Sequence, residues 1–307
     1  MNTNKVSRYK GVYVAMYSAY DDAGRVDTER VKRLARSYAG TGVKGLYVGG
    51  SSGEGLLQSV EERKRVVEAV LEEVKGELTV MVHVGANSTP DSVELSRHAE
   101  QCGADLISAV PSIYYRLSDA AVERHWQQMI DSTSLPFVIY HIPQTTGFQL
   151  SPALFERMAR QDKVIGIKMS GESTYELQQF KDIGGEDFLV FNGPDEQFLA
   201  GRIMGADGGI GGTYGVMPEL FCSLNRLFEE GRLDEAQQLQ VRINRIIRSL
   251  VGYPSLYGAC KYMLELRGIE TGIPRGPLLS VAPEHHEPLA ALNREILALT
   301  NEYASSR

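Results

Sequence analysis

Short apolar runs alternate with longer amphipathic segments along most of the chain. The short runs are rich in Val, Ile and Tyr and have the length of β-strands, whereas the longer segments repeat their apolar residues at helical spacing. Strands are predicted near residues 11–18, 45–51, 79–85, 106–111, 136–142, 164–170, 188–194 and 207–213. Helices are predicted near residues 27–41, 60–75, 89–102, 118–132, 151–160, 174–183, 195–204 and 218–230.

Short polar residues that can cap a helix precede four of these helices. They are Asp27, Ser59, Ser118 and Ser151. Glu62 follows Ser59 by three residues, which predicts a reciprocal capping box.

The regular alternation of strand and helix predicts an α/β fold with a parallel sheet. Eight such units in residues 1–230 fit a closed (β/α)8 TIM barrel better than an open doubly wound sheet, so we expect this part to be the catalytic domain. Residues 231–307 have apolar residues at helical spacing and predict a C-terminal extension of three helices. The Pro- and Gly-rich segment 268–283 joins two of them.

Composition narrows the partners that the protein can have. The 307 residues are 43% hydrophobic and 23% charged, with a net charge of −7, which is ordinary for a globular protein and argues against nucleic acid. No apolar run approaches the length of a membrane span, and we see no signal peptide. Cys102, Cys222 and Cys260 are far apart and form no disulfide or zinc pattern, so a cytoplasmic location is expected.

Lys168 stands out because it lies in a run that otherwise predicts a buried strand. Alternation places it on one face of the strand with Val164, Gly166 and Ser170, while Ile165 and the other bulky residues take the opposite face. Burial favours the neutral form of an amine, and a neutral amine in a dry pocket can form a Schiff base with a ketone. The alternative is a lysine at the strand end that reaches solvent.

Active sites of such barrels lie at the carboxyl ends of the strands. Several different strands bring chemically useful side chains to that end, which favours a functional Lys168. These candidates are Ser51, Ser52, Tyr114, Tyr140, Lys168, Ser170, Asp195 and Glu196.

The segment 49–55, GGSSGEG, ends the second strand and precedes a helix. Its backbone N–H groups and the hydroxyls of Ser51 and Ser52 could hold a carboxylate. It could also be a tight turn that needs glycine, or, as Gly-x-Ser-x-Gly, the nucleophile elbow of a serine hydrolase. The elbow needs a later histidine, and His285 and His286 are expected to be solvated surface residues.

Tyr140 can reach Lys168 if Val138 and Tyr140 point into the barrel, where a phenol could relay protons. It could instead fill core volume, and His141 then faces the helices as a structural residue. The glycine-rich segment 207–214 could bind phosphate or leave room for a substrate. The sequence has no metal or dinucleotide motif, so we expect no metal and no dissociable cofactor.

These motifs resemble the class I pyruvate-dependent aldolases, the family that includes N-acetylneuraminate lyase and dihydrodipicolinate synthase. The resemblance spans nearly the whole chain. It is carried by GLYVGGSSGEG at 45–55, AVPSIYY at 109–115, YHIPQTTG at 140–147, GIKMSGES at 166–173, NGPDEQF at 192–198 and GADGGIGGTY at 205–214.

The resemblance implies a carbon–carbon lyase that binds pyruvate and an aldehyde. Lys168 would be the Schiff-base lysine and Tyr140 the proton relay, helped by a hydroxyl chain through Ser51 and Tyr114. Ser51 and Ser52 would hold the carboxylate of pyruvate, with Ile210 lining its pocket. Tyr114 matches a loop tyrosine that family members insert across a dimer interface, and the family is typically a homotetramer, a dimer of dimers.

The details favour the sialic acid lyase branch. Synthases have a carboxylate-binding arginine where this chain has Thr145, and an arginine fork is hard to replace. By the resemblance, lyases carry Asp-Glu after the seventh strand, and Asp195 and Glu196 match this pair. Gly193 precedes the pair, and Ser170 occupies the position of a lyase threonine. Two departures, Gly212 for a sugar-binding serine and Pro194 for an aromatic residue, leave room for another substrate.

The alternatives are therefore a 4-hydroxy-tetrahydrodipicolinate synthase, a 2-keto-3-deoxy sugar acid aldolase, a non-catalytic keto-acid-binding barrel and, least favoured, the hydrolase.

Overall fold

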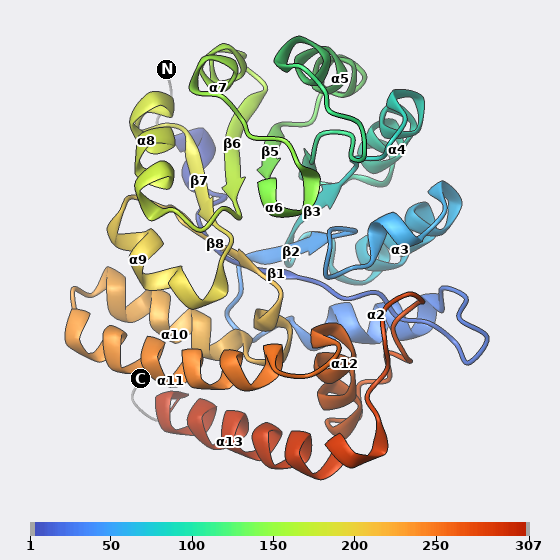
Figure 1. Cartoon of the computed structure of the whole chain (residues 1–307), viewed down its shortest axis with the longest axis vertical. Coiled ribbons are helices and arrows are strands. Elements are labelled where there is room, and N and C mark those ends of the chain that lie inside the picture. The colour runs from blue at the N-terminus through green and yellow to red at the C-terminus, as the bar shows by residue number, and fades with distance from the viewer. Residues whose placement is uncertain (1–3, 305–307) are drawn as a thin grey trace.

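Eight parallel strands close into a barrel in sequential order, with helices outside it (Figure 1). The computed structural model describes residues 4–304. The strands are β1 (Gly11–Ala15), β2 (Gly45–Val48), β3 (Thr79–His83), β4 (Leu106–Ala109), β5 (Phe137–His141), β6 (Val164–Met169), β7 (Leu189–Asn192) and β8 (Gly208–Gly211). Because β1 pairs with β8, the barrel has no open edge, which confirms the predicted TIM barrel.

A helix follows each strand. These helices are α2 (Thr28–Ser37), α3 (Val60–Val74), α4 (Thr89–Cys102), α5 (Asp119–Asp131), α7 (Pro152–Ala159), α8 (Thr174–Gly184), α9 (Phe198–Ile203) and α10 (Pro218–Glu229). The short helices α1 (Asn4–Ser7) and α6 (Pro143–Thr146) were not predicted, and the predicted helix 195–204 begins with a 3₁₀ turn at Asp195–Gln197.

The four predicted N-caps are confirmed. The side chains of Asp27, Ser59, Ser118 and Ser151 accept hydrogen bonds from backbone N–H groups in the first turn of α2, α3, α5 and α7. Ser59 and Glu62 form the complete capping box. Local sequence therefore determines where these helices begin.

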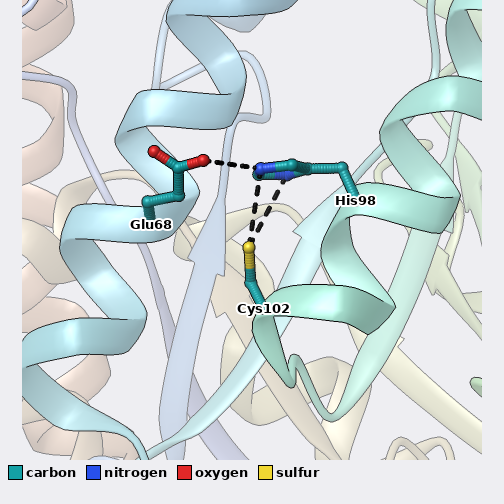
Figure 2. Close-up of side chains that lie close together, drawn as sticks. All are labelled: Glu68, His98 and Cys102. Atoms are coloured by element: carbon teal, nitrogen blue, oxygen red, sulfur yellow. Dashed lines mark hydrogen bonds and ion pairs between the residues drawn. The ribbon is translucent and has the colours of Figure 1, made fainter.

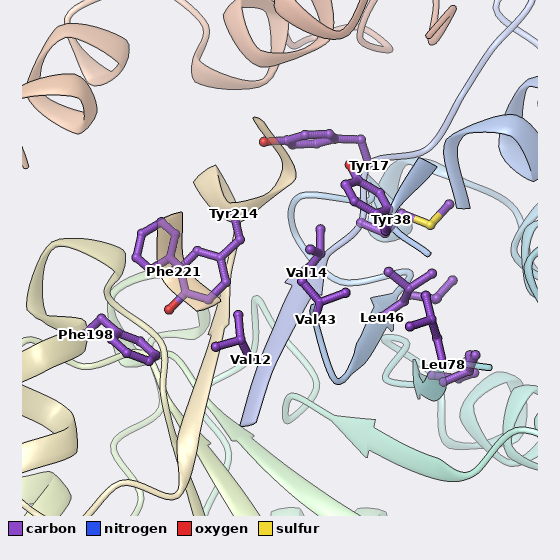
Figure 3. Close-up of a cluster of buried hydrophobic side chains, with 14 of the residues drawn as sticks. Val12, Val14, Tyr17, Tyr38, Val43, Leu46, Leu78, Phe198, Tyr214 and Phe221 are labelled. Atoms are coloured by element: carbon purple, nitrogen blue, oxygen red, sulfur yellow. The ribbon is translucent and has the colours of Figure 1, made fainter. Parts of the chain in front are cut away.

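The strands separate an inner core from an outer core. In β1, Tyr13 and Ala15 belong to the interior of the barrel, whereas Val12 and Val14 pack outward. Figure 3 shows part of the outer core, where Phe198, Tyr214 and Phe221 lie beside Val12. Alternation along each strand thus decides which side chains point towards the barrel axis.

Three further helices follow the barrel: α11 (Leu233–Val251), α12 (Leu256–Leu266) and α13 (His286–Ala304). α11 and α13 pack beside α10, and α12 packs near the turn that follows β8 (Figure 1). The division into a barrel domain of residues 1–230 and a separate extension of residues 231–307 stays a prediction. Within residues 4–304, no helix is long and apolar enough to cross a membrane.

A buried ion pair connects α12 to the loop after β2. Lys261 Nζ lies 2.6 Å from Glu54 Oε1, and both side chains are almost completely inaccessible to solvent. The other carboxylate oxygen of Glu54 accepts a hydrogen bond from the backbone N–H of Arg275. Glu54 has a positive φ of 55°, so these contacts hold it in a conformation that non-glycine residues rarely adopt. Helix α12 therefore fixes the shape of the 49–55 loop.

Removing one charge of this pair should destabilise the protein strongly. Lys261→Met leaves the Glu54 carboxylate buried and unpaired, which we expect to lower the free energy of unfolding by about 3 kcal/mol or more. Chemical denaturation measures the loss. Lys32→Met is the control, because Lys32 pairs with Glu72 at the surface and its loss should cost far less.

The double variant Glu54→Gln/Lys261→Met should recover part of the loss, because it leaves no unpaired charge. A Lys261→Met protein as stable as the wild type would contradict this role of the pair.

Candidate functional site

A cavity of about 350 Å³ opens at the carboxyl ends of the strands. Residues predicted from the sequence make up much of its lining. They are Ser51, Ser52, Tyr140, Thr145, Lys168, Ser170, Gly193, Pro194, Asp195, Glu196, Ile210 and Gly212. The barrel thus brings together residues that are up to 161 positions apart in the sequence, from Ser51 to Gly212.

Lys168 lies inside the barrel and not in solvent. The residue is 5% exposed, and its register partner on the neighbouring strand is Tyr140. Its Nζ lies 4.1 Å from the centre of the Tyr140 ring and 4.7 Å from that of Tyr47. Within residues 4–304, no carboxylate lies within ion-pair distance of this amine. The alternative of a solvent-reaching lysine is therefore wrong.

Tyr140 also points inward, as predicted, and its hydroxyl is 3.5 Å from Ser51 Oγ. Burial raises the pKa of this phenol, but the charge of Lys168 and hydrogen bonding with Ser51 lower it by more, so the net shift is downward. A phenol whose pKa is lowered beside an amine is suited to exchange protons with it. His141 faces outward against Phe180, with ring centres 6.2 Å apart, as expected for a structural residue.

The loop 49–55 brings its two serines to the cavity in different environments. Ser51 is exposed on the cavity side, whereas Ser52 is only 8% exposed. Ser52 lies beside Tyr257 of α12: burial raises the pKa of Tyr257 to about 12, although hydrogen bonding with Ser52 opposes this shift. A Cβ at Gly212 would come within 2.7 Å of Ser52 Oγ, so the glycine leaves this hydroxyl its space.

Asp195 and Glu196 lie side by side after β7 but are not equivalent. Asp195 is 8% exposed, and its Oδ2 accepts hydrogen bonds from the backbone N–H and the hydroxyl of Thr213 at 2.7 and 2.5 Å. Burial raises the pKa of Asp195 to about 6, although the Thr213 hydrogen bonds oppose the shift. Glu196 is exposed at the rim of the cavity.

Ser170 and Gly193 belong to the same side of the cavity. A Cβ at Gly193 would come within 2.1 Å of Ser170 Oγ, so the absence of a side chain at Gly193 makes room for that hydroxyl. Ile210 of β8 is fully buried at the inner end of the cavity.

Tyr114 is the one predicted catalytic residue that does not line this cavity. It is 89% exposed, has a φ of 80° and packs edge-on against Tyr115, with ring centres 5.3 Å apart. Within a single chain it therefore makes no contact with the other predicted site residues, and its role across a dimer interface stays a prediction.

The hydrolase alternative finds no support in the geometry. Ser51 Oγ is within hydrogen-bond distance of a tyrosine hydroxyl, not of a histidine. His285 packs edge-on against Tyr253, and His286 stacks on Tyr262 with ring centres 4.4 Å apart. Both histidines are half-buried, because Tyr253, between α11 and α12, and Tyr262 of α12 cover part of each ring.

Sequence analysis missed a polar layer behind Tyr140. The ring of His83 meets the Tyr140 ring edge-to-face at 5.9 Å, its Nδ1 is 3.1 Å from the Gly49 carbonyl, and its Nε2 accepts from the Val110 N–H. Burial, then the charge of Arg63, lowers the pKa of His83 well below its usual value, so the ring is neutral.

Arg63 itself is 4% exposed and donates to the backbone carbonyls of His83 and Gly85. Burial lowers the pKa of its guanidinium to about 10. The two residues connect the loops after β2, β3 and β4 directly behind Tyr140. The position of His83 on an inward-facing register of β3 could have indicated this layer.

The C-terminal helices supply part of the cavity wall that was also missed. Ile247 and Val251 come from α11, and Leu256 and Tyr257 come from α12. Nothing local in the sequence marks them, since only tertiary packing brings these helices to the mouth of the barrel.

A profile of the Dihydrodipicolinate synthetase family matches residues 8–296. The chain belongs to the dihydrodipicolinate synthetase family. This agrees with the aldolase family that the motifs resemble, and family members among its relatives are carbon–carbon lyases.

Relatives with known names are similar over nearly their full length. N-acetylneuraminate lyase of Mediterraneibacter gnavus is 43% identical over 92% of this chain and 90% of its own, and that of Rhizobium meliloti is 36% identical over 94% and 95%. A solved structure of a catalytic lysine mutant of Ruminococcus gnavus sialic acid aldolase has a TM-score of 0.95 and 40% identity, and covers 97% of this chain and 99% of its own.

The raised pKa of Asp195 makes a prediction about stability. The folded chain holds this proton up to pH about 6, whereas the ordinary value is 3.8. Between pH of about 4 and about 6, Asp195 is therefore protonated in the folded chain and ionised in the unfolded chain. The free energy of unfolding should fall as pH rises through this range, by about 3 kcal/mol from this group.

Asp195→Asn keeps an acceptor for Thr213 without the charge, and should remove this component of the pH dependence. Denaturation at a series of pH values measures it, with Glu196→Gln as the control at the exposed neighbour. Identical profiles for Asp195→Asn and the wild type would show that Asp195 ionises as it does in water.

Proposed function

We propose that the protein is an N-acetylneuraminate lyase, which cleaves sialic acid to pyruvate and N-acetylmannosamine through a Schiff base on Lys168. The observation that carries the proposal is the Lys168 amine, buried between two tyrosine rings at the inner end of a cavity and free of any carboxylate among the described residues. The 43% identity to a lyase and the match to an aldolase defined by a catalytic lysine support it.

The first half of the reaction forms the imine. The Lys168 nitrogen attacks the 2-keto carbon, and the carbonyl oxygen takes a proton to give a carbinolamine. Loss of that hydroxyl as water yields an iminium. Tyr140 is the group placed to move these protons, because its ring lies against the amine and its hydroxyl meets Ser51.

The iminium then acts as an electron sink. Removal of the proton from the C4 hydroxyl lets the C3–C4 bond break, with its electron pair moving into the iminium. N-acetylmannosamine leaves as the aldehyde, and the enamine of pyruvate stays on Lys168. Protonation at C3 and hydrolysis release pyruvate and restore the amine. Since the imine supplies the electron sink, the proposal requires no dissociable cofactor.

The remaining residues fit the two ends of the substrate. The hydroxyls and backbone of Ser51 and Ser52 follow β2 and can hold the carboxylate of the keto acid, with Ile210 against its apolar part. Asp195 and Glu196, on the opposite wall with Ser170 and Gly193, offer acceptors for sugar hydroxyls.

Thr145 lines the cavity where synthases carry arginine, and this argues against a second carboxylate substrate. The second candidate is an aldolase of a 2-keto-3-deoxy sugar acid, which Gly212 and Pro194 favour, since a glycine in place of a serine and a proline in place of an aromatic residue leave room for another substrate.

The assembly belongs to the same proposal. Tyr114 is exposed, has a backbone φ in the left-handed region and lies outside the cavity of its own chain. These features suit a residue that completes the site of a second subunit. We therefore propose a homotetramer built as a dimer of dimers. We place it in the cytoplasm because Cys102, Cys222 and Cys260 form no disulfide bond.

Borohydride reduction tests the central step. In the presence of pyruvate, or of N-acetylneuraminate, the wild-type protein should gain one pyruvate-derived adduct at Lys168, detected by intact mass and peptide mapping. Lys168→Arg keeps the charge but cannot form the imine, and should show neither adduct nor turnover. Adduct formation with pyruvate alone would retain the family chemistry and reject the sialic acid substrate, and no adduct with either would reject the mechanism.

Tyr140→Phe should lower kcat by about 10²- to 10⁴-fold, the range that a lost proton-transfer group costs. The ring that packs on Lys168, Tyr47 and His83 is retained, so KM should change much less. Steady-state kinetics with N-acetylneuraminate measure both constants. A Tyr140→Phe enzyme within a few-fold of the wild-type kcat would remove Tyr140 from the relay.

A further inference from the structure

Outside the barrel, three potential metal ligands converge between α3 and α4. Glu68 comes from α3, and His98 and Cys102 are one helical turn apart on α4 (Figure 2). His98 Nε2 lies 2.8 Å from Glu68 Oε1 and 3.5 Å from Cys102 Sγ. One ligand atom from each residue lies within 4.8 Å of the other two. A carboxylate, an imidazole and a thiol therefore lie close enough for one cation to contact all three once the side chains rotate.

The arrangement is not that of a catalytic triad. In a triad the acid and the nucleophile contact opposite nitrogens of the histidine, whereas here Cys102 Sγ is closer to Nε2, the nitrogen that meets Glu68, than to Nδ1, at 3.5 and 3.9 Å. Burial, and then the nearby Glu68 charge, raises the pKa of the Cys102 thiol, so the thiol is not activated as a nucleophile. What the three groups share is metal-binding chemistry, since each offers one ligand atom within reach of the others.

We propose that Glu68, His98 and Cys102 form a binding site for a zinc-type divalent cation that links α3 to α4. The cation replaces the hydrogen bonds of His98 Nε2 with bonds to nitrogen, sulfur and oxygen. One thiol proton is released to solvent for each cation bound. The thiolate and the carboxylate together balance its two positive charges.

The donor set selects the kind of cation. Sulfur and imidazole nitrogen suit Zn²⁺, whereas Mg²⁺ and Ca²⁺ prefer oxygen ligands. Tetrahedral zinc, with bonds of about 2.3 Å to sulfur and about 2.0 Å to nitrogen, separates those two atoms by about 3.5 Å. Sγ and Nε2 are 3.5 Å apart, close to this value, but Sγ is also 3.9 Å from Nδ1 and so lies beside the ring and off the Nε2 lone pair.

The Cys102 side chain has to rotate towards the Nε2 lone pair, and Glu68 has to move away from Nε2. Its oxygen is closer to Nε2 than two ligands of one zinc ion would be, by about half an ångström. The Glu68 side chain is 54% exposed and can make that shift, and the ion pair it gives up is of the exposed kind that contributes little to stability. A hollow lined by Lys64, Glu94, Arg97 and Gln101 lies beside His98, so solvent can reach this residue.

The test uses the full-length protein after treatment with a chelator and gel filtration. Titration with Co²⁺ should produce the near-ultraviolet absorption of a cobalt–thiolate bond, which saturates at one equivalent and is abolished by Zn²⁺. Saturating Zn²⁺, but not Mg²⁺, should also raise the melting temperature, since the ion binds the folded state.

Matched variants identify the ligands. Cys102→Ser should lose the cobalt–thiolate absorption, and His98→Gln should weaken affinity on the order of 100-fold. Cys222→Ser is the control, because Cys222 is another half-buried cysteine outside any disulfide, on α10. Near-ultraviolet circular dichroism and pyruvate trapping at Lys168 establish that each variant is folded.

The proposal is overturned if the wild type shows no cobalt–thiolate absorption, or if Cys102→Ser retains it. Because Lys168 takes no part in the site, its trapping with pyruvate succeeds or fails independently of this outcome.

Discussion

The pairing of Lys168 with Tyr140 across two neighbouring strands is the constraint on which the site depends. The register of β5 against β6 sets these two residues opposite each other, and barrel closure then surrounds them with Tyr47 and Phe191. A buried amine next to an aromatic face, without a carboxylate, gains cation–π stabilisation but no full compensation for the loss of water. The rest of the barrel has to hold this unfavourable arrangement in place.

Two sets of contacts do so from opposite sides. Behind Tyr140, the buried Arg63 binds the carbonyls of His83 and Gly85, and His83 in turn supports the Tyr140 ring. In front, α12 supplies Lys261, whose ion pair fixes the 49–55 loop, and Tyr257, which lies beside Ser52. The C-terminal helices therefore contribute residues to the site in addition to those of the barrel.

The sequence was sufficient to predict those features of the fold and the site that depend on neighbouring residues in the chain. Strand alternation placed Lys168 and Tyr140 inside the barrel, and short polar residues before helices marked the four N-caps. The elements ended differently from expectation where a turn intervenes: β2 stops at Val48 because Gly49 has a φ of 75°. Residues of tertiary origin were not predictable, since Tyr257, Arg63 and the Glu68–His98–Cys102 cluster acquire their surroundings from elements that are distant in the sequence. The tyrosines that cover His285 and His286 are a further example.

Gly212 has a consequence for anyone who wishes to redesign the substrate range. Its missing side chain gives Ser52 its space, so a Cβ at this position would lie 2.7 Å from the serine oxygen. Positions 52 and 212 are thus energetically coupled, and their substitutions should not be additive. A library that varies Gly212 alone, in search of a new aldehyde partner, would also disturb Ser52, whose hydroxyl is proposed to bind the keto acid. Varying both positions together would let those two requirements be met at once.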